Sequence, residues 1–340
     1  MRLAVALPSW VGDAVMATPV LRALRTRFPD ARIVAVVRPY VRPVMDPNPW
    51  TDAFIEADKS AVEFLRAASR LRKEVIDVGV LLPNSFRSAL LFRLAGVKRR
   101  VGYDRGGRGA LLTDRIQPEK RGGRFVPTPQ IAYYLRLAEV LGAPTGDLRM
   151  ELFPTEADEA AAEAAYRAAG LTPERTLLLC PGAAFGPSKR WPPVHWGTLV
   201  REARAKFGLD SAILCAPSDA DLATTIIESA GGRCATFHDK GINLASARAV
   251  VRRARAMVAI DSGLRHYAAA LGRPVVSLFG PTDVRWTETW YEKEVRLQSV
   301  PPCGPCQRPT CPVGTTECMW KIEPEEVLDA LTEALERDRA

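Results

Sequence analysis

The sequence has no long hydrophobic run. No stretch approaches the roughly 20 apolar residues that a helix needs to cross a bilayer, although 47% of the 340 residues are hydrophobic. The apolar run at the N-terminus, residues 1–7, is too short for a secretory signal, and Pro8 stops it. These two absences predict a cytoplasmic protein, with peripheral contact at the inner face of the membrane left open.

A glycine-rich dinucleotide fingerprint is also missing. A nicotinamide-binding loop after the first strand would contain Gly-x-Gly-x-x-Gly. The corresponding stretch "LPSWVGDAVMATP", residues 7–19, holds a single glycine, Gly12. The sequence therefore disfavours binding of a nicotinamide cofactor.

The seven cysteines do not indicate the disulfide framework of a secreted protein. Three of them are scattered (Cys180, Cys215 and Cys234), and the first two fall in expected core strands. The other four are clustered as Cys303-x2-Cys306-x4-Cys311-x6-Cys318. Four thiols in such a Pro- and Gly-containing stretch could hold a structural zinc ion or an iron–sulfur cluster. Reduced thiols or disulfides remain the alternative.

The net charge of +8 and the pI near 9.3 favour an anionic partner. Nucleic acid, an anionic membrane surface and acidic small molecules all fit this charge. A surface of solvated arginines explains the same excess equally well.

Apolar, β-rich runs alternate with helical patterns along the chain, which predicts two open α/β domains with parallel sheets. A polar stretch at residues 142–154 predicts a boundary between domains 1–150 and 151–340, with the C-terminal helix free to pack back on the first. Residues 106–123, rich in Gly and Arg, are predicted to form a mobile loop. Expected strands are 2–7, 33–37, 77–82, 100–102, 176–180, 211–216, 256–260 and 275–279; expected helices are 15–28, 60–73, 85–94, 131–141, 156–170, 194–207, 219–230, 264–271 and 324–337.

Ligands of open α/β sheets bind at the carboxyl ends of the strands, so the loops there are the candidate sites. Asp13 follows Gly12 after the first strand. A carboxylate at this place could cap its helix, an interaction of about 1 kcal/mol. It could equally serve as a general base.

Two loops of the second half indicate binding of a phosphate. In "CPGAAFGPSKRWPP", residues 180–193, Lys189 and Arg190 come just before a helix; in "IDSGLRHYAAA", residues 260–270, Asp261 and Ser262 lead into another. Free backbone N–H groups at a helix start, with a cation nearby, attract anions. A solvated Lys-Arg pair and a merely structural His266 are the alternatives.

Taken together, the motifs resemble the ADP-heptose:lipopolysaccharide heptosyltransferases, glycosyltransferase family 9, and most of all the heptosyltransferase II group of that family. They follow family order from residue 5 to about 330. The matching stretches are "LPSWVGDAVMATP", "LPNSFRSALLFRLAGVKRRVGY", "PGAAFGPSKRWP", "DSGLRHYAAALGRPVVSLFGPTD" and "IEPEEV".

The resemblance implies a GT-B fold, with two Rossmann-like domains that face each other across a cleft. It implies an inverting transfer of L-glycero-D-manno-heptose from ADP-heptose to the first inner-core heptose, in an α1→3 bond. The partners are then ADP-heptose and an anionic lipopolysaccharide acceptor rather than nucleic acid, and no cofactor is required for catalysis. Alternatives are another family 9 transferase, of the heptosyltransferase I or III type, or a non-catalytic nucleotide-sugar-binding protein.

The family's catalytic base falls on Asp13, which is expected both to cap its helix and to accept the proton of the acceptor hydroxyl. The implied donor-binding residues are Lys189, Asp219, Asp261, Ser262, Gly263, Leu264 and His266. The acceptor is assigned to Gly12, Asn84, Ser85, Arg87 and Arg105, within a basic rim that also includes Arg38, Arg42 and Arg108. The chain departs from the family at Ala184, where relatives carry Glu, and at Arg265, where an apolar residue is common.

Overall fold

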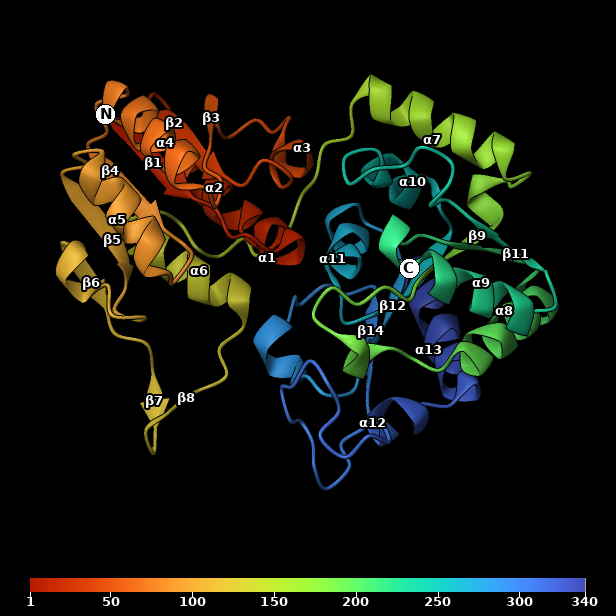
Figure 1. The fold of residues 1–340 in the computed structure, drawn as a ribbon. Helices are drawn as coiled ribbons and strands as arrows, with labels where there is room; N and C mark the ends of the chain where they lie inside the picture. The colour runs from red at the N-terminus through yellow and green to blue at the C-terminus, as the bar shows by residue number, and fades with distance from the viewer. Residues whose placement is uncertain (340) are drawn as a thin grey trace. The chain divides into compact units, whose positions relative to one another are not determined.

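A computed structural model describes residues 1–339 of the chain, which forms two compact units. The first unit comprises Met1–Phe153 with Arg285–Thr289, and the second comprises Pro154–Val284 with the chain from Trp290 onward. Each unit is built on a six-stranded parallel sheet with helices packed against it (Figure 1). The α/β class and the parallel sheets expected from the sequence are confirmed.

The first sheet has the strand order β3-β2-β1-β4-β5-β6. The chain runs outward from β1 to β3 and then returns to continue from β4, so the order reverses between β1 and β4. In such sheets the ligand site lies at the carboxyl ends of the strands beside this reversal. The strands are β1 (Arg2–Ala6), β2 (Arg32–Val37), β3 (Ala53–Glu56), β4 (Val78–Leu81), β5 (Arg99–Tyr103) and β6 (Asp114–Ile116), with a separate hairpin of β7 (Lys120–Arg121) and β8 (Arg124–Phe125).

The helices of the first unit begin soon after the strands. The long helix expected at residues 15–28 is two helices, because Pro19 lies in the first turn of the second one and has no amide to continue the ladder of the first. The expected mobile loop at 106–123 is partly ordered, since it contains a 3₁₀ turn and β6. The helices are α1 (Val11–Val15), α2 (Thr18–Arg27), α3 (Arg42–Met45), α4 (Ala61–Lys73), α5 (Phe86–Leu94) and α6 (Gln130–Glu139).

The second sheet repeats the topology of the first, in the order β11-β10-β9-β12-β13-β14. Its strands are β9 (Thr176–Cys180), β10 (Asp210–Ile213), β11 (Cys234–Thr236), β12 (Ala256–Ile260), β13 (Val275–Phe279) and β14 (Glu294–Gln298). Its helices are α7 (Glu156–Ala168), α8 (Pro193–Phe207), α9 (Ala220–Ser229), α10 (Ala247–Arg253), α11 (Gly263–Ala270), α12 (Glu317–Trp320) and α13 (Pro324–Arg337).

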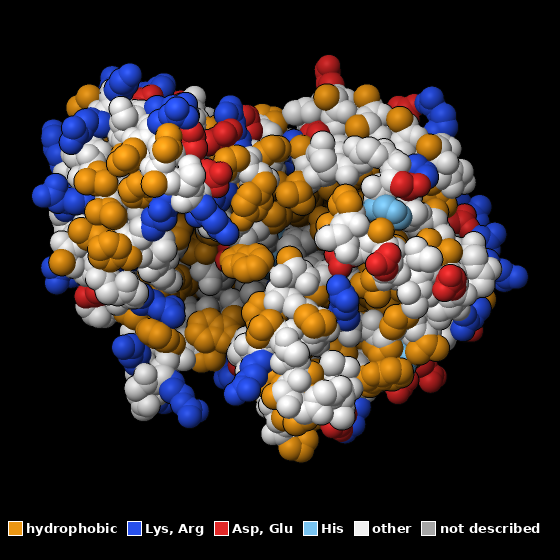
Figure 2. Space-filling view, viewed as in Figure 1, with side chains coloured by type: hydrophobic (Ala, Val, Ile, Leu, Met, Phe, Trp, Pro, Cys, Tyr) orange, Lys and Arg blue, Asp and Glu red, His pale blue; other side chains and the backbone are white. Residues whose placement is uncertain are grey.

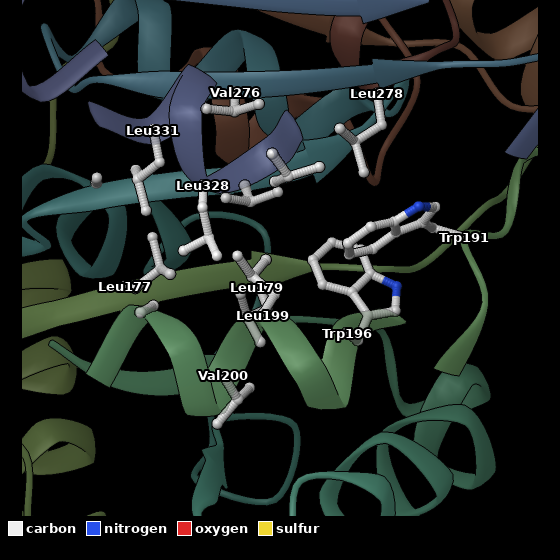
Figure 3. Packing of buried hydrophobic residues seen from close by; sticks show 14 of the residues in the cluster. Leu177, Leu179, Trp191, Trp196, Leu199, Val200, Val276, Leu278, Leu328 and Leu331 are labelled. Atoms are coloured by element: carbon white, nitrogen blue, oxygen red, sulfur yellow. The ribbon is translucent and has the colours of Figure 1, made fainter. Parts of the chain in front are cut away.

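The core of the second unit lies between the sheet and helices α8 and α13. Leu177 and Leu179 of β9 face Leu199 of α8, and Leu331 of α13 joins the same cluster (Figure 3). Trp191 and Trp196 pack edge to face with ring centroids 4.9 Å apart. The sequence allowed the C-terminal helix to pack on the first domain. In the structure this helix, α13, contributes to the core of the second unit. Among residues 1–339, no helix is both long and apolar enough to span a membrane.

Candidate functional site

The candidate residues of the first unit meet at the carboxyl edge of its sheet. β1 and β4 are paired neighbours, with Ala6 opposite Leu81. Because α1 follows β1 and α5 follows β4, Asp13 and Ser85 come to the same edge from segments about 70 residues apart in the chain. The reversal point of the sheet therefore carries the candidate base and part of the candidate acceptor site.

Asp13 does not cap its helix, so that part of the expectation is wrong. The N-cap position of α1 is Trp10, and no side chain caps this helix. The helix starts at Val11, earlier than the sequence suggested, and this places the half-buried Asp13 within its first turn. A carboxylate in the first turn is stabilised by the helix dipole without being a cap.

Tyr134 of α6 lies within electrostatic reach of Asp13. Burial raises the pKa of the Tyr134 phenol well above its usual value, and the negative charge of Asp13 raises it further. The phenol accordingly stays protonated near the carboxylate. The protonated phenol is therefore a neutral polar neighbour of the candidate base.

A pocket opens at the same edge of the first sheet and has a volume of about 500 Å³ with its open mouth included. Ala6, Val36 and Phe92 belong to its apolar lining, and Arg38 and Arg87 line it as well. An apolar lining with a few charged groups is typical of a small-molecule site.

Both pocket arginines are anchored on the segment that follows β3. Arg38 donates to the carbonyl oxygen of Ala57 at 2.9 Å, and Arg87 donates to the carbonyl oxygens of Asp58 and Ser60 at 3.1 and 3.0 Å. These bonds hold the two cations in place at the pocket. Arg38 comes directly after β2. This position at the end of a strand is the sequence feature that predicted Arg38 at this edge of the sheet.

Three other arginines of the expected basic rim are engaged elsewhere in the first unit. Arg108 is fully buried and donates to the carbonyl oxygens of Tyr103 and Pro83, so its assignment to the rim is wrong. Burial lowers its pKa to about 10. Arg105 stacks on a phenyl ring, and Arg42 is paired with two carboxylates.

Asn84 holds the loop of Arg108 rather than standing free for a ligand. Its side-chain oxygen accepts from Arg108 at 3.3 Å and from the hydroxyl of Tyr133 at 3.2 Å. A Cβ on Gly106, whose φ is +64°, would lie 2.7 Å from the carbonyl oxygen of Asn84. Ser85 caps α5, because its hydroxyl accepts from the backbone N–H of Ser88 at 3.2 Å.

In the second unit, Lys189 and Asp261 form a buried ion pair. The two residues follow β9 and β12, which are neighbouring strands. The Lys189 ammonium donates to a carboxylate oxygen of Asp261 at 2.6 Å and to its carbonyl oxygen at 2.9 Å. Lys189 is only 8% exposed. The sequence placed both residues at a donor site, and the structure brings them into direct contact.

The ion pair extends into a buried network that the sequence did not reveal. Arg265 bridges Asp261 at 3.3 Å and Glu294 at 2.6 Å, and Thr282 donates to Asp261 at 2.7 Å. Burial raises the pKa of the Asp261 carboxyl, but its interactions with Lys189, Arg265 and Thr282 outweigh this effect and hold the pKa at about 2. Arg265, for which the family resemblance suggested an apolar residue, thus has a carboxylate partner on β14.

The start of α11 presents polar groups that have no protein partner. The hydroxyl of Ser262 and Nδ1 of His266 are buried, and neither has a hydrogen-bond partner within the described part of the chain. Burial, and then the charge of Arg265, lower the pKa of His266 well below its usual value, so the imidazole is neutral. Together with the first-turn amides of Gly263 and Leu264, these groups suit an anion.

Asp219 lies beside the loop that precedes Lys189. Its carboxylate pairs with Arg190 at 3.2 Å. A Cβ on Gly182 would lie 2.6 Å from its other oxygen, so only glycine fits there without displacing the carboxylate. The seven expected donor residues are therefore gathered at the ends of β9, β10 and β12, which are adjacent in the sheet.

The clustered cysteines lie in residues 303–318, here called the cysteine-rich segment, and all four line one small, narrow pocket. None of them is in a disulfide. Burial raises the pKa of the Cys318 thiol, and the other three cysteines raise it further. Within residues 1–339, no group of three or more His, Cys, Asp or Glu side chains stands in a metal-holding arrangement, so the thiols share a cavity without forming a preassembled site.

Two doubly wound units in tandem are the architecture of the GT-B glycosyltransferases, the class to which this fold belongs. A family model described as "Glycosyltransferase family 9 (heptosyltransferase)" matches residues 64–316. The chain belongs to glycosyltransferase family 9 and is a glycosyltransferase.

Individual relatives agree with this assignment along the whole chain. Lipopolysaccharide heptosyltransferase 2 of Escherichia coli is 28% identical over 354 residues and is covered completely, as is this chain. Lipooligosaccharide heptosyltransferase 2 of Haemophilus ducreyi is 29% identical, with 88% of this chain and 89% of the relative aligned. The solved structure of the E. coli ADP-heptose lps heptosyltransferase II superposes over the full length of both chains with a TM-score of 0.81 and 28% identity.

Proposed function

We propose that the protein transfers L-glycero-D-manno-heptose from ADP-heptose to the first inner-core heptose of lipopolysaccharide, in an α1→3 bond. The similar E. coli enzyme is named for the donor ADP-heptose and for lipopolysaccharide, and it aligns with this chain from end to end. The observation that carries the proposal is the buried Lys189–Asp261 pair beside the side chains of Ser262 and His266, whose polar atoms have no hydrogen-bond partner within residues 1–339. This arrangement suits a diphosphate.

In the proposed reaction, the acceptor hydroxyl oxygen attacks the anomeric carbon of the heptose from the face opposite ADP. The new C–O bond forms as the bond to the diphosphate breaks, and ADP leaves with the electron pair, which inverts the configuration. Asp13 accepts the hydroxyl proton. Lys189 and the amides at the start of α11 stabilise the charge that develops on the leaving diphosphate.

The first unit is the proposed acceptor domain because of its charge. Residues 1–153 contain 25 Lys and Arg against 15 Asp and Glu, whereas the rest of the chain contains 22 against 24. In Figure 2, Lys and Arg side chains are spread over the surface of this unit, at the left of the view. A basic surface favours the anionic inner core and peripheral contact with the inner membrane surface, where such an acceptor would be found.

The proposed reaction uses no bound metal and no organic cofactor. Asp13 supplies the base, and Lys189 supplies the charge that a metal provides in other transferases. A structural zinc ion or iron–sulfur cluster, one of the alternatives that the cysteine spacing left open, would belong to the cysteine-rich segment and not to the reacting centre.

A transfer assay with several donors and acceptors tests the function. Purified protein, ADP-heptose and a core acceptor that ends at the first heptose should give ADP and a product one heptose larger. Transfer only to an acceptor without heptose, or only to a longer core, would assign a heptosyltransferase I or III type activity instead. Binding of ADP-heptose without turnover on any acceptor would indicate a non-catalytic binding protein.

Arg87→Ala is expected to raise the KM for a charged acceptor about 10- to 100-fold, because a charge-assisted hydrogen bond contributes roughly 1.5–3 kcal/mol. The KM for ADP-heptose should not change. Steady-state kinetics with each substrate varied in turn provide the measurement. Arg93→Ala, at the exposed end of the same helix, is the matched control, and an Arg87→Ala enzyme with the acceptor KM of the control would remove Arg87 from the acceptor site.

A further inference from the structure

The cysteine-rich segment packs against the loop that carries Lys189. The backbone N–H of Ser188 donates to the carbonyl oxygen of Pro309 at 3.1 Å, and its hydroxyl donates to that of Arg308 at 2.6 Å. A Cβ on Gly186 would lie only 2.3 Å from the Pro309 oxygen, so the two chains touch here through glycine. Ser188 precedes Lys189, and the segment therefore fixes the backbone from which the donor-site cation extends.

The same segment also holds the loop after β13. The backbone N–H of Gln307 donates to the carbonyl oxygen of Pro281 at 2.8 Å. The next residue, Thr282, donates to the carboxylate of Asp261 at 2.7 Å. Residues 307–309 lie between Cys306 and Cys311. They thus contact Ser188, the residue before Lys189, and Pro281, the residue before the Asp261 partner Thr282.

The segment has little else to hold its own shape. Its one helix among the described residues is α12, of four residues, and most of its side chains are exposed or half-buried. A chain of this kind is usually cross-linked by disulfides or by a metal. The thiols form no disulfide, and a backbone N–H, that of Thr316, donates to the sulfur of Cys311 at 3.4 Å. Such N–H donors support a thiolate that ligates a metal.

We infer that Cys303, Cys306, Cys311 and Cys318 bind a thiolate-preferring metal, and that this metal site holds the donor-binding loops of Lys189 and Thr282 in place. Four sulfur ligands suit zinc or iron in tetrahedral coordination. Binding draws together the four sulfurs that line the cavity, and each thiol releases its proton to solvent. The cysteines are positioning residues in this scheme, because they act through the loops and do not touch the donor. The inference rests on one part of the proposed function, which is that the donor site binds ADP.

Metal binding is tested on the full-length, reduced protein. Elemental analysis after purification without added metal should give about one zinc per chain, or iron, with acid-labile sulfide only if the iron is in a cluster. Titration of the metal-free protein with Co²⁺ should produce the visible and near-ultraviolet bands of a tetrahedral thiolate complex. Four reactive thiols in this segment that persist in the presence of Zn²⁺ and Co²⁺ would overturn the metal site.

The positioning role is tested by the affinity for ADP, measured by calorimetry. Cys306→Ser/Cys311→Ser should lose the metal and bind ADP about ten-fold more weakly. Ser188→Ala should keep the metal and bind ADP a few-fold more weakly, because it loses one hydrogen bond to the segment. Cys234→Ala, on β11 outside the segment, is the control and should bind ADP normally.

The outcomes separate the inference from the proposed function. A metal-bound protein whose ADP affinity is unchanged in both Ser188→Ala and the cysteine variant would overturn the positioning role. A cysteine variant that merely melts at a lower temperature, with unchanged ADP affinity when folded, would overturn it as well. If the wild-type protein binds metal and ADP but transfers no heptose, the proposed substrates fail and this inference stands.

Discussion

Asp13→Asn is expected to lower the turnover of heptose transfer by about 100-fold or more, since a positioned general base contributes roughly 10²–10⁴ in rate. The amide keeps the size of the side chain but cannot accept the proton of the acceptor hydroxyl. Because Asp13 lies in the first turn of α1 and is not its cap, the change should also remove a helix-dipole contribution to stability of about 0.3–1 kcal/mol. Initial rates at saturating ADP-heptose, together with thermal unfolding, measure the two effects separately.

The control for Asp13→Asn is Asp30→Asn, which removes one negative charge from an exposed turn of the same unit. The control should transfer heptose at the wild-type rate. Affinity for ADP should be the same in both variants and in the wild type, since the donor is assigned to the second unit. A folded Asp13→Asn protein with turnover close to that of the control would exclude Asp13 as the base.

Lys189→Met should weaken ADP binding by about 10- to 100-fold, the equivalent of the roughly 1.5–3 kcal/mol of a charge-assisted hydrogen bond. The same change should destabilise the protein, because it leaves the buried carboxylate of Asp261 without its closest cation. Removing one partner of a buried ion pair costs about 3–5 kcal/mol, and Arg265, at 3.3 Å, should offset part of this cost. Calorimetric titration with ADP and chemical unfolding are the measurements.

A double variant separates the structural role of Lys189 from its binding role. Lys189→Met/Asp261→Asn removes the stranded charge together with the cation, so it should recover most of the lost stability. It should not recover ADP affinity, since the diphosphate still lacks its cation. If ADP bound the double variant as tightly as the wild type, Lys189 would have only a structural role.

The sequence predicted the fold to the extent that the relevant information is local. Continuous apolar runs identified strands such as β1 and β12, and helical periodicity identified α4 and α8 close to their observed bounds. Short elements escaped notice, including β3, β11 and α10, because a few residues do not establish a period. The split between α1 and α2 was missed although Pro19 marks it, since the apolar spacing continues across the break.

The candidate site was predicted where loops follow strands, since the carboxyl ends of parallel strands meet at one edge. This rule brought Asp13 and Ser85 to one edge of the first sheet and Lys189 and Asp261 to one edge of the second. The rule placed Arg108 in an exposed basic rim, and this prediction was wrong because Arg108 is buried. In the sequence, nothing distinguishes Arg108 from the other arginines of its Gly-rich loop. Its buried guanidinium donates to the carbonyl oxygens of Tyr103, five residues earlier, and of Pro83, 25 residues earlier, and the second contact depends on how the chain folds back.

The sequence by itself determined the α/β class, the doubled pattern of elements, the family and the loops that carry charge. These features depend on local periodicity, on glycine and proline positions, and on motifs in a fixed order. Only the tertiary structure decided that Arg265 has a carboxylate partner in Glu294, and that the cysteine-rich segment contacts the loop before Lys189. Such contacts join residues about 30 and 120 positions apart, and they depend on strand order and on packing, which no local pattern records.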